Sequence, residues 1–215
     1  MRNILCYGDS NTYGLSPEWL TGNPGRHAPD VRWPGALQKL LGDDYHIIEE
    51  GLNGRTTVFD DPTSFGRCGL DFLQICIESH LPLDLIILML GTNDCRSLFG
   101  VSPAEIAAGM GRLVQTALNP FIYMMFPVPK ILIAAPVPIG EAATRLPDGI
   151  TTLESVEKSR RLAAQYEPLA KMMGCEFIDL GAAASASPDE GIHLTAEGHG
   201  AVARAMAAKI REIFE

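Results

Sequence analysis

Ser10 follows a short apolar run, Ile4 to Tyr7, that ends at Gly8. Such a run predicts a buried strand, and the polar residues 9–12 after it are typical of the start of a helix or a tight turn. A serine at this place would point its hydroxyl into the crevice at the carboxyl end of a parallel sheet, where open α/β folds bind ligands. Its backbone N–H would lie among the unpaired donors of a helix start, which can stabilise a developing negative charge. We therefore interpret Ser10 as a nucleophile.

His193 is the candidate for the base that a serine nucleophile needs, because an imidazole can take up the hydroxyl proton near neutral pH. It lies in the segment Glu190-Gly191-Ile192-His193-Leu194-Thr195, just before the last predicted helix. Such a base needs a carboxylate that fixes its tautomer and stabilises the imidazolium. Glu190, three residues earlier, or Asp189 can reach His193 across one turn, so the residues alone leave both open as the acid.

Three donors could stabilise the negative charge of a tetrahedral intermediate: the backbone N–H groups of Ser10 and Gly54 and the side-chain amide of Asn93. Gly54 comes shortly after the second predicted strand, and Asn93 lies in Gly91-Thr92-Asn93-Asp94, directly after the third. We expect these donors to converge, because the carboxyl ends of parallel strands share one edge of a sheet. One missing oxyanion donor typically reduces the rate by ~10²–10³, so these positions matter nearly as much as the nucleophile and base.

Short apolar runs alternate along the chain with segments of helical periodicity, which predicts a parallel sheet covered on both faces. The run 84–90 is continuously apolar, as a central parallel strand should be. A capping-box pattern at 102–105 opens a helix that ends near Leu118, and Pro168 is expected to kink or divide a long helix over 151–173. We find no repeat or linker and predict one domain, residues 1–215. The other predicted strands are 4–7, 46–50, 130–135 and 176–179, the other helices are 33–41, 70–80 and 195–214, and the loops are 15–30, 51–69 and 181–191.

Composition excludes several classes of function. Seventeen basic and 26 acidic residues give a net charge of −9, which argues against a nucleic-acid or anionic-membrane surface. The start of the chain lacks the pattern of a signal peptide, and the longest apolar stretch, Leu81 to Leu90, is too short to span a bilayer. The five cysteines are widely spaced, without the spacing of a zinc site or a disulfide framework. We expect free thiols and a cytoplasmic protein.

Four blocks of the chain together resemble the SGNH (GDSL-type) hydrolase superfamily: Gly8-Asp9-Ser10-Asn11, the isolated Gly54, Gly91-Thr92-Asn93-Asp94, and the acid-x-x-His pattern that ends at His193. The resemblance covers almost the whole chain. Further stretches are similar to the bacterial arylesterase/acyltransferase branch of that superfamily. These are Ile4-Leu5-Cys6-Tyr7-Gly8-Asp9-Ser10, Asp30-Val31-Arg32-Trp33, Glu49-Glu50-Gly51-Leu52, Arg55-Thr56-Thr57 and Leu81-Pro82-Leu83-Asp84-Leu85, which runs on to Asp94.

The resemblance implies a flavodoxin-like, three-layer α/β/α sandwich with a central five-stranded parallel sheet. It also implies a Ser-His-acid triad, an oxyanion hole from Ser10, Gly54 and Asn93, no metal or other cofactor, and a homo-oligomer. The family usually has Asp at the position of Glu190, and we place Glu190 ahead of Asp189 as the acid. Leu15 stands where the acyltransferase relatives tend to have Trp, which favours hydrolysis over strong acyl transfer.

The leading hypothesis is a serine esterase that cleaves small carboxylic esters through an acyl-enzyme, which water or an alcohol then resolves. Alternatives on the same site are a deacetylase of acetylated carbohydrates, a lysophospholipase and a thioesterase. Two readings from other classes are metal-dependent phosphoryl transfer and a non-catalytic binding module. We expect Asp9 to orient the turn and Asp94 to cap the next helix. The predicted substrate pocket comprises Asp9, Asn11, Leu15, Thr92, Arg96 and Ile192.

Overall fold

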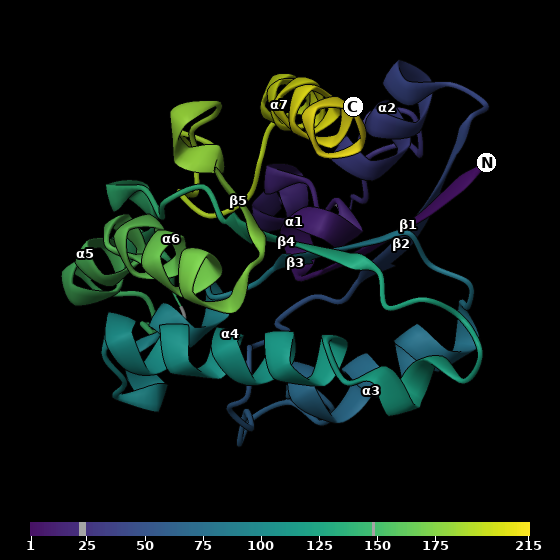
Figure 1. Cartoon of the computed structure of the whole chain (residues 1–215). Helices are drawn as coiled ribbons and strands as arrows, with labels where there is room; N and C mark the ends of the chain where they lie inside the picture. Colours follow the sequence, from purple (N-terminus) through teal and green to yellow (C-terminus); the bar gives the residue numbers. More distant parts are fainter. Residues whose placement is uncertain (22–24, 148) are drawn as a thin grey trace.

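Five parallel strands form one central sheet in the order β2-β1-β3-β4-β5. The structure, a computed structural model, describes residues 1–21, 25–147 and 149–215. The sheet order places the change of winding direction between β1 and β3, where ligand crevices form in doubly wound folds (Figure 1). The predicted fold class and all five predicted strands are confirmed. The strands are β1 (Arg2–Gly8), β2 (Tyr45–Gly51), β3 (Leu85–Met89), β4 (Lys130–Ala135) and β5 (Glu176–Asp179).

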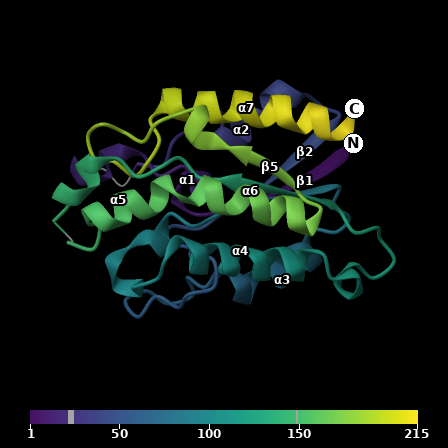
Figure 2. The same ribbon diagram turned by 60° about the vertical axis from the view of Figure 1, so that its left-hand side comes forward.

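Helices cover both faces of the sheet because successive side chains of a strand point to opposite sides (Figures 1 and 2). Ile4 and Cys6 of β1 pack into the layer of α2 and α7, whereas Leu5 and Tyr7 pack into the layer of α3, α4 and α6. Within the described ranges, no helix is long and apolar enough to cross a membrane. The helices are α1 (Ser10–Tyr13), α2 (Trp33–Leu41), α3 (Gly69–Ser79), α4 (Pro103–Ala117), α5 (Leu153–Arg160), α6 (Leu162–Met173) and α7 (Ala196–Phe214).

Two glycines let the short helix α1 pack closely on the ends of its neighbouring strands. A Cβ at Gly8, the last residue of β1, would lie 2.0 Å from Oγ1 of Thr12. A Cβ at Gly51, the last residue of β2, would lie 2.1 Å from the backbone nitrogen of Tyr13. Since real Cβ atoms do not approach so closely, a larger residue at either position would displace α1, which begins with Ser10.

The predicted long helix over 151–173 is two helices, and the break is not where we expected it. Pro168 lies inside α6, which continues to Met173. The chain divides at Arg161, whose backbone N–H bonds the carbonyl of Lys158, three residues back. Just before the break, the Ser159 hydroxyl donates to the Val156 carbonyl and accepts from the Ile139 backbone N–H, so it ties the end of α5 to the loop after β4.

Two predicted loops contain short 3-10 helices. The loop 15–30 holds η1 (Pro17–Thr21) and an isolated bridge between Leu15 and Arg26, while its residues 22–24 lie outside the described residues. The first two residues of the loop 181–191 belong to η6 (Leu180–Ala182). The capping box of α4 is present, with Ser102 and Glu105 each bonding the other's backbone N–H. The remaining short helices are η2 (Asn93–Cys95), η3 (Ser97–Phe99), η4 (Pro120–Tyr123) and η5 (Glu141–Arg145).

A neutral histidine joins α2 and α7, the two helices that cover one face of the sheet. His199, in the first turn of α7, is fully buried, and its Nδ1 accepts a hydrogen bond of 3.1 Å from the backbone N–H of Trp33 in α2. Its ring meets that of His27 edge to face. Burial, together with the nearby cationic groups, lowers the pKa of His199 to about 3 from its ordinary 6.5.

We expect His199 to make the fold sensitive to acid. Below pH 6.5 this histidine takes up a proton in the unfolded chain but not in the folded one, so stability falls as the pH falls toward 3. The loss from this group between pH 7 and pH 5 is about 2 kcal/mol in the free energy of unfolding. Urea unfolding at both pH values measures it.

The variant His199→Asn keeps an acceptor for the Trp33 N–H and should lack this part of the pH dependence. His46→Asn is the matched control, because His46 is exposed in β2. Equal pH slopes in the wild type and His199→Asn would contradict the assignment.

Candidate active site

Ser10 is the first residue of α1, at the carboxyl end of the interior strand β1. Asp9 is the N-cap, and its side chain accepts a hydrogen bond of 2.9 Å from the Asn11 backbone N–H. The Ser10 side chain lines a cavity although the residue is only 5% exposed. As the first helical residue, Ser10 has a backbone N–H without an intrahelical acceptor. The strand and cap therefore present both a hydroxyl and a backbone donor to the cavity.

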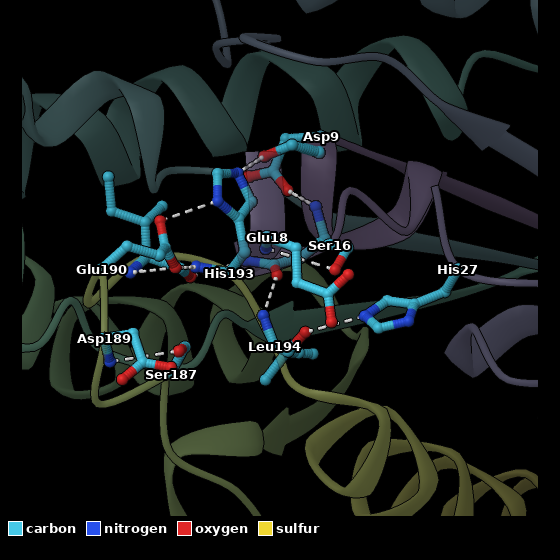
Figure 3. Close-up of polar contacts among 12 residues, drawn as sticks. Asp9, Ser16, Glu18, His27, Ser187, Asp189, Glu190, His193 and Leu194 are labelled. Atoms are coloured by element: carbon cyan, nitrogen blue, oxygen red, sulfur yellow. Dashed lines mark hydrogen bonds and ion pairs between the residues drawn. The ribbon is translucent and has the colours of Figure 1, made fainter. Parts of the chain in front are cut away.

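His193 lies between Ser10 and Glu190. Its Nε2 is 2.9 Å from the Ser10 Oγ. Its Nδ1 is 2.9 Å from Oε2 of Glu190, and Figure 3 shows this pair. The other carboxylate oxygen of Glu190 accepts the backbone N–H groups of Ile192 (2.9 Å) and of His193 itself. One carboxylate thus fixes both the course of the loop and the orientation of the ring.

Of the two residues that the sequence leaves open as the acid, Glu190 is the one whose carboxylate contacts His193. Glu190 is fully buried against His193, whereas Asp189 is exposed and its backbone N–H donates to the Ser187 hydroxyl (Figure 3). Burial alone would raise the pKa of Glu190, but the hydrogen bonds and charge of His193 outweigh it, so the pKa lies below its ordinary value. Glu190 is therefore ionised at neutral pH and favours a proton on the facing Nδ1 of His193.

Gly54 and Asn93 line the same cavity as Ser10 and His193. The Asn93 amide donates a bond of 3.0 Å to the carbonyl of Arg55, the residue after Gly54. Gly54 itself has a φ of +77°, a backbone conformation that favours glycine. The structure thus brings all three predicted oxyanion donors to one cavity.

Two buried side chains hold the loop that carries Gly54. The Arg55 guanidinium donates through Nη1 to the Gly8 carbonyl (2.9 Å) and to the Glu50 carbonyl, at the ends of β1 and β2. Asp94 accepts the backbone N–H (2.9 Å) and the hydroxyl of Thr57. Asp94 therefore anchors this loop, which differs from the helix cap that we expected. Burial raises the pKa of Asp94 to about 6 in spite of the bonds from Thr57.

The predicted pocket residues divide into two groups. Leu15, Thr92, Arg96 and Ile192 line the cavity, as expected. Asp9 and Asn11 do not, because both side chains turn into the protein and bond to backbone groups there. Burial raises the pKa of Asp9 to about 6, against the opposing effects of its bond from Asn11 and of the His193 charge.

The cavity has a volume of about 200 Å³. Sequence reasoning missed several of its residues. Trp19 of η1 stands edge to face with the His193 ring, with 6.4 Å between ring centroids. The presence of a tryptophan in a Gly/Pro-rich loop was the sequence signal that could have identified Trp19, whereas the segment 139–151 carries no motif. The missed lining residues are Trp19, Asn53, Ile139, Leu146, Ile150 and Thr151.

Arg96 is the cationic group of the cavity wall. Its Nε donates to the Asn93 carbonyl (3.2 Å), and its guanidinium pairs with the buried Asp61. Burial alone would raise the pKa of Asp61, but bonds from Thr63 and Arg96 lower it to about 2. Asp61 is therefore ionised at neutral pH, and Arg96 adds polarity to a largely apolar wall while it pairs with this carboxylate.

Within the described ranges, one group of side chains has the spacing of metal ligands: Asp60, Cys68 and Asp71, whose ligand atoms lie within 4.8 Å of one another. None of the three lines the cavity. The cavity instead combines a serine hydroxyl, an imidazole within hydrogen-bond reach, a buried carboxylate behind that imidazole, and nearby amide donors. Such an arrangement can deprotonate the hydroxyl for attack on a carbonyl and stabilise the resulting oxyanion.

Comparison with known proteins agrees with this chemistry. The structure superimposes with a TM-score of 0.93 on Est24, a carbohydrate acetylesterase from Sinorhizobium meliloti, at 41% identity over 100% of both chains. It is equally similar, at a TM-score of 0.93 and 39% identity over 99% of both chains, to the native aryl esterase of M. smegmatis.

A curated relative, an acetylxylan esterase from Xylanibacter ruminicola, is 25% identical over 97% of this chain, which spans only 43% of that protein's length. The profile of the GDSL-like lipase/acylhydrolase family matches residues 6–201. The chain is an esterase-type hydrolase with the SGNH fold, and it belongs to the GDSL-like lipase/acylhydrolase family.

Proposed function

We propose that this protein is a serine esterase that hydrolyses small carboxylic esters with a short acyl chain and an aryl or alkyl leaving group. The observation that carries the proposal is the continuous hydrogen-bonded series from the Ser10 hydroxyl through His193 to Glu190. A cavity of about 200 Å³ with a largely apolar wall suits a short acyl chain.

In the proposed reaction, the Ser10 Oγ attacks the ester carbonyl carbon while His193 Nε2 takes the hydroxyl proton. The Ser10 and Gly54 backbone N–H groups and the Asn93 amide stabilise the tetrahedral oxyanion. As the intermediate collapses, His193 gives the proton to the leaving alcohol, and the acyl group stays on Ser10. Water then attacks the acyl-enzyme with His193 again as base, which releases the acid and restores the Ser10 hydroxyl. An alcohol in place of water would give acyl transfer.

One prediction of the proposed function concerns the nucleophile. Ser10→Ala should reduce kcat for 4-nitrophenyl acetate by at least ~10³-fold, because the acyl-enzyme can no longer form. Ser16→Ala is a matched control: Ser16 is buried in the same region, and its hydroxyl accepts the Glu18 backbone N–H. Addition of a chelator should leave the wild-type rate unchanged. Hydrolysis that persists in Ser10→Ala, or that stops with the chelator, argues for a different nucleophile or a metal.

A second prediction of the proposed function concerns the acid. In Glu190→Gln the amide would face His193 Nδ1 with a donor and so impose the wrong tautomer, with an expected loss in kcat of roughly 10²- to 10⁴-fold. Asp189→Asn should stay within about twofold of the wild type, because Asp189 is exposed and does not contact the ring. Stopped assays of both variants at saturating substrate measure this difference. Equal losses of kcat in the two variants would contradict the assignment of Glu190 as the acid.

A second candidate function is the removal of acetyl groups from carbohydrates, which the carbohydrate acetylesterase at 41% identity and the acetylxylan esterase favour. The side chains of Asn53 and Arg96 give the cavity wall polar groups for this substrate. We expect acetate to be the preferred acyl group in either case. A higher kcat/KM for acetylated xylo-oligosaccharides than for 4-nitrophenyl acetate would favour the carbohydrate substrate, and the reverse order would favour the simple ester. Under either candidate function, an ester with an 8-carbon acyl chain should be a poor substrate.

A further inference from the structure

The side chain of Asn11 hydrogen-bonds the backbone of both residues adjacent to His193. Its Nδ2 donates to the Ile192 carbonyl (3.2 Å), and its Oδ1 accepts from the Leu194 backbone N–H (3.0 Å). These two residues flank His193 in sequence. Asn11 is 3% exposed and does not line the cavity, so its contribution would act through the backbone of the histidine segment.

The segment 187–195, which carries His193, depends on such contacts because it contains no regular helix or strand. Several of its hydrogen bonds are internal: Ser187 N–H to the His193 carbonyl (2.8 Å), Gly191 N–H to the Ser187 carbonyl (2.8 Å), and those of Glu190. Internal bonds make the segment rigid but do not fix its distance from Ser10.

Contacts from outside the segment set its position in the molecule. The Gly140 backbone N–H bonds the Gly191 carbonyl (2.7 Å), and His27 Nε2 is 3.2 Å from the Leu194 carbonyl (Figure 3). Both partners belong to other loops. Asn11, in contrast, follows Ser10 directly in α1, so its amide joins the nucleophile's own helix to both chain neighbours of the base.

We propose that Asn11 is a positioning residue whose amide sets the approach of His193 Nε2 to Ser10 Oγ. The inference rests on the proposed function, in which this proton transfer is the first chemical event. A misplacement of about 1 Å can reduce a rate by 10²-fold, so loss of the two bonds should slow attack by Ser10 on the order of 10–10²-fold. Substrate binding should change little, because Asn11 does not touch the cavity.

Gln38 provides a matched control at a distance from the site. Its Nε2 donates to the carbonyls of Gly42 (3.0 Å) and Tyr45 (2.9 Å), and its Oε1 accepts from the Ile47 backbone N–H (2.9 Å). Like Asn11, Gln38 uses both ends of its side-chain amide to hydrogen-bond backbone groups. Gln38→Leu should therefore lower the thermal stability as Asn11→Leu does, without an effect on the chemistry.

The experiment compares the wild type, Asn11→Leu and Gln38→Leu by thermal unfolding, by kcat and KM for 4-nitrophenyl acetate, and by the rate of Ser10 labelling with a fluorophosphonate. Labelling needs only an activated serine, so it does not depend on the identity of the natural ester. We expect Asn11→Leu to lose on the order of 10–10²-fold in kcat and in labelling rate, with KM within about twofold. Gln38→Leu should match the wild type in kcat, KM and labelling rate, although its thermal stability falls.

Labelling of folded Asn11→Leu at the wild-type rate would overturn the inference, as would an equal loss in Gln38→Leu. If Asn11→Leu does not fold, Asn11→Ser decides in its place, because its shorter side chain cannot span both backbone groups, and wild-type labelling in that variant again overturns the inference. A wild type that is not labelled at all overturns the proposed function and this inference with it. If the wild type is labelled, the proposed nucleophile stands, and a negative result in the Asn11 variants counts only against the role of Asn11.

Discussion

The site depends on hydrogen bonds between side chains and the backbone of a segment that has no regular secondary structure. Residues 187–195 carry the proposed base, yet they belong to neither a strand nor a helix. Glu190 bonds the backbone N–H groups of Ile192 and His193 with one oxygen and the imidazole with the other. Correct geometry of the loop and correct orientation of the ring therefore arise together, and neither can be lost without the other.

Buried charges of both signs lie near the residues that line the cavity. Asp9 and Asp94 are both buried, and burial raises the pKa of each to about 6, so both carry negative charge at neutral pH. Such charge would oppose an oxyanion above it. Arg55 supplies a buried positive charge in the same region, since its guanidinium bonds the carbonyls at the ends of β1 and β2 and lies 4.0 Å from the centre of the Tyr7 ring.

The sequence was sufficient for the sheet and for the four motif-bearing segments, because continuous apolar runs and polar strand ends are local signals. It was not sufficient where a tertiary contact decides the outcome. Pro168 is a local signal for a kink, but the helix divides at Arg161. Asn11 looked like a pocket residue from its place beside Ser10, but its amide turns inward to backbone groups 181 and 183 positions away. The wall residues Ile139, Leu146 and Ile150 carry no motif, because an apolar lining requires only bulk. The single domain, the homo-oligomer and the cytoplasmic location stay predictions.

The proposed nucleophile and base lie 183 positions apart in the chain, one at its first strand and the other just before its last helix. During synthesis, the serine leaves the ribosome long before the segment that activates it. Under the proposed function, a nascent chain that ends before residue 187 therefore holds a serine without its base.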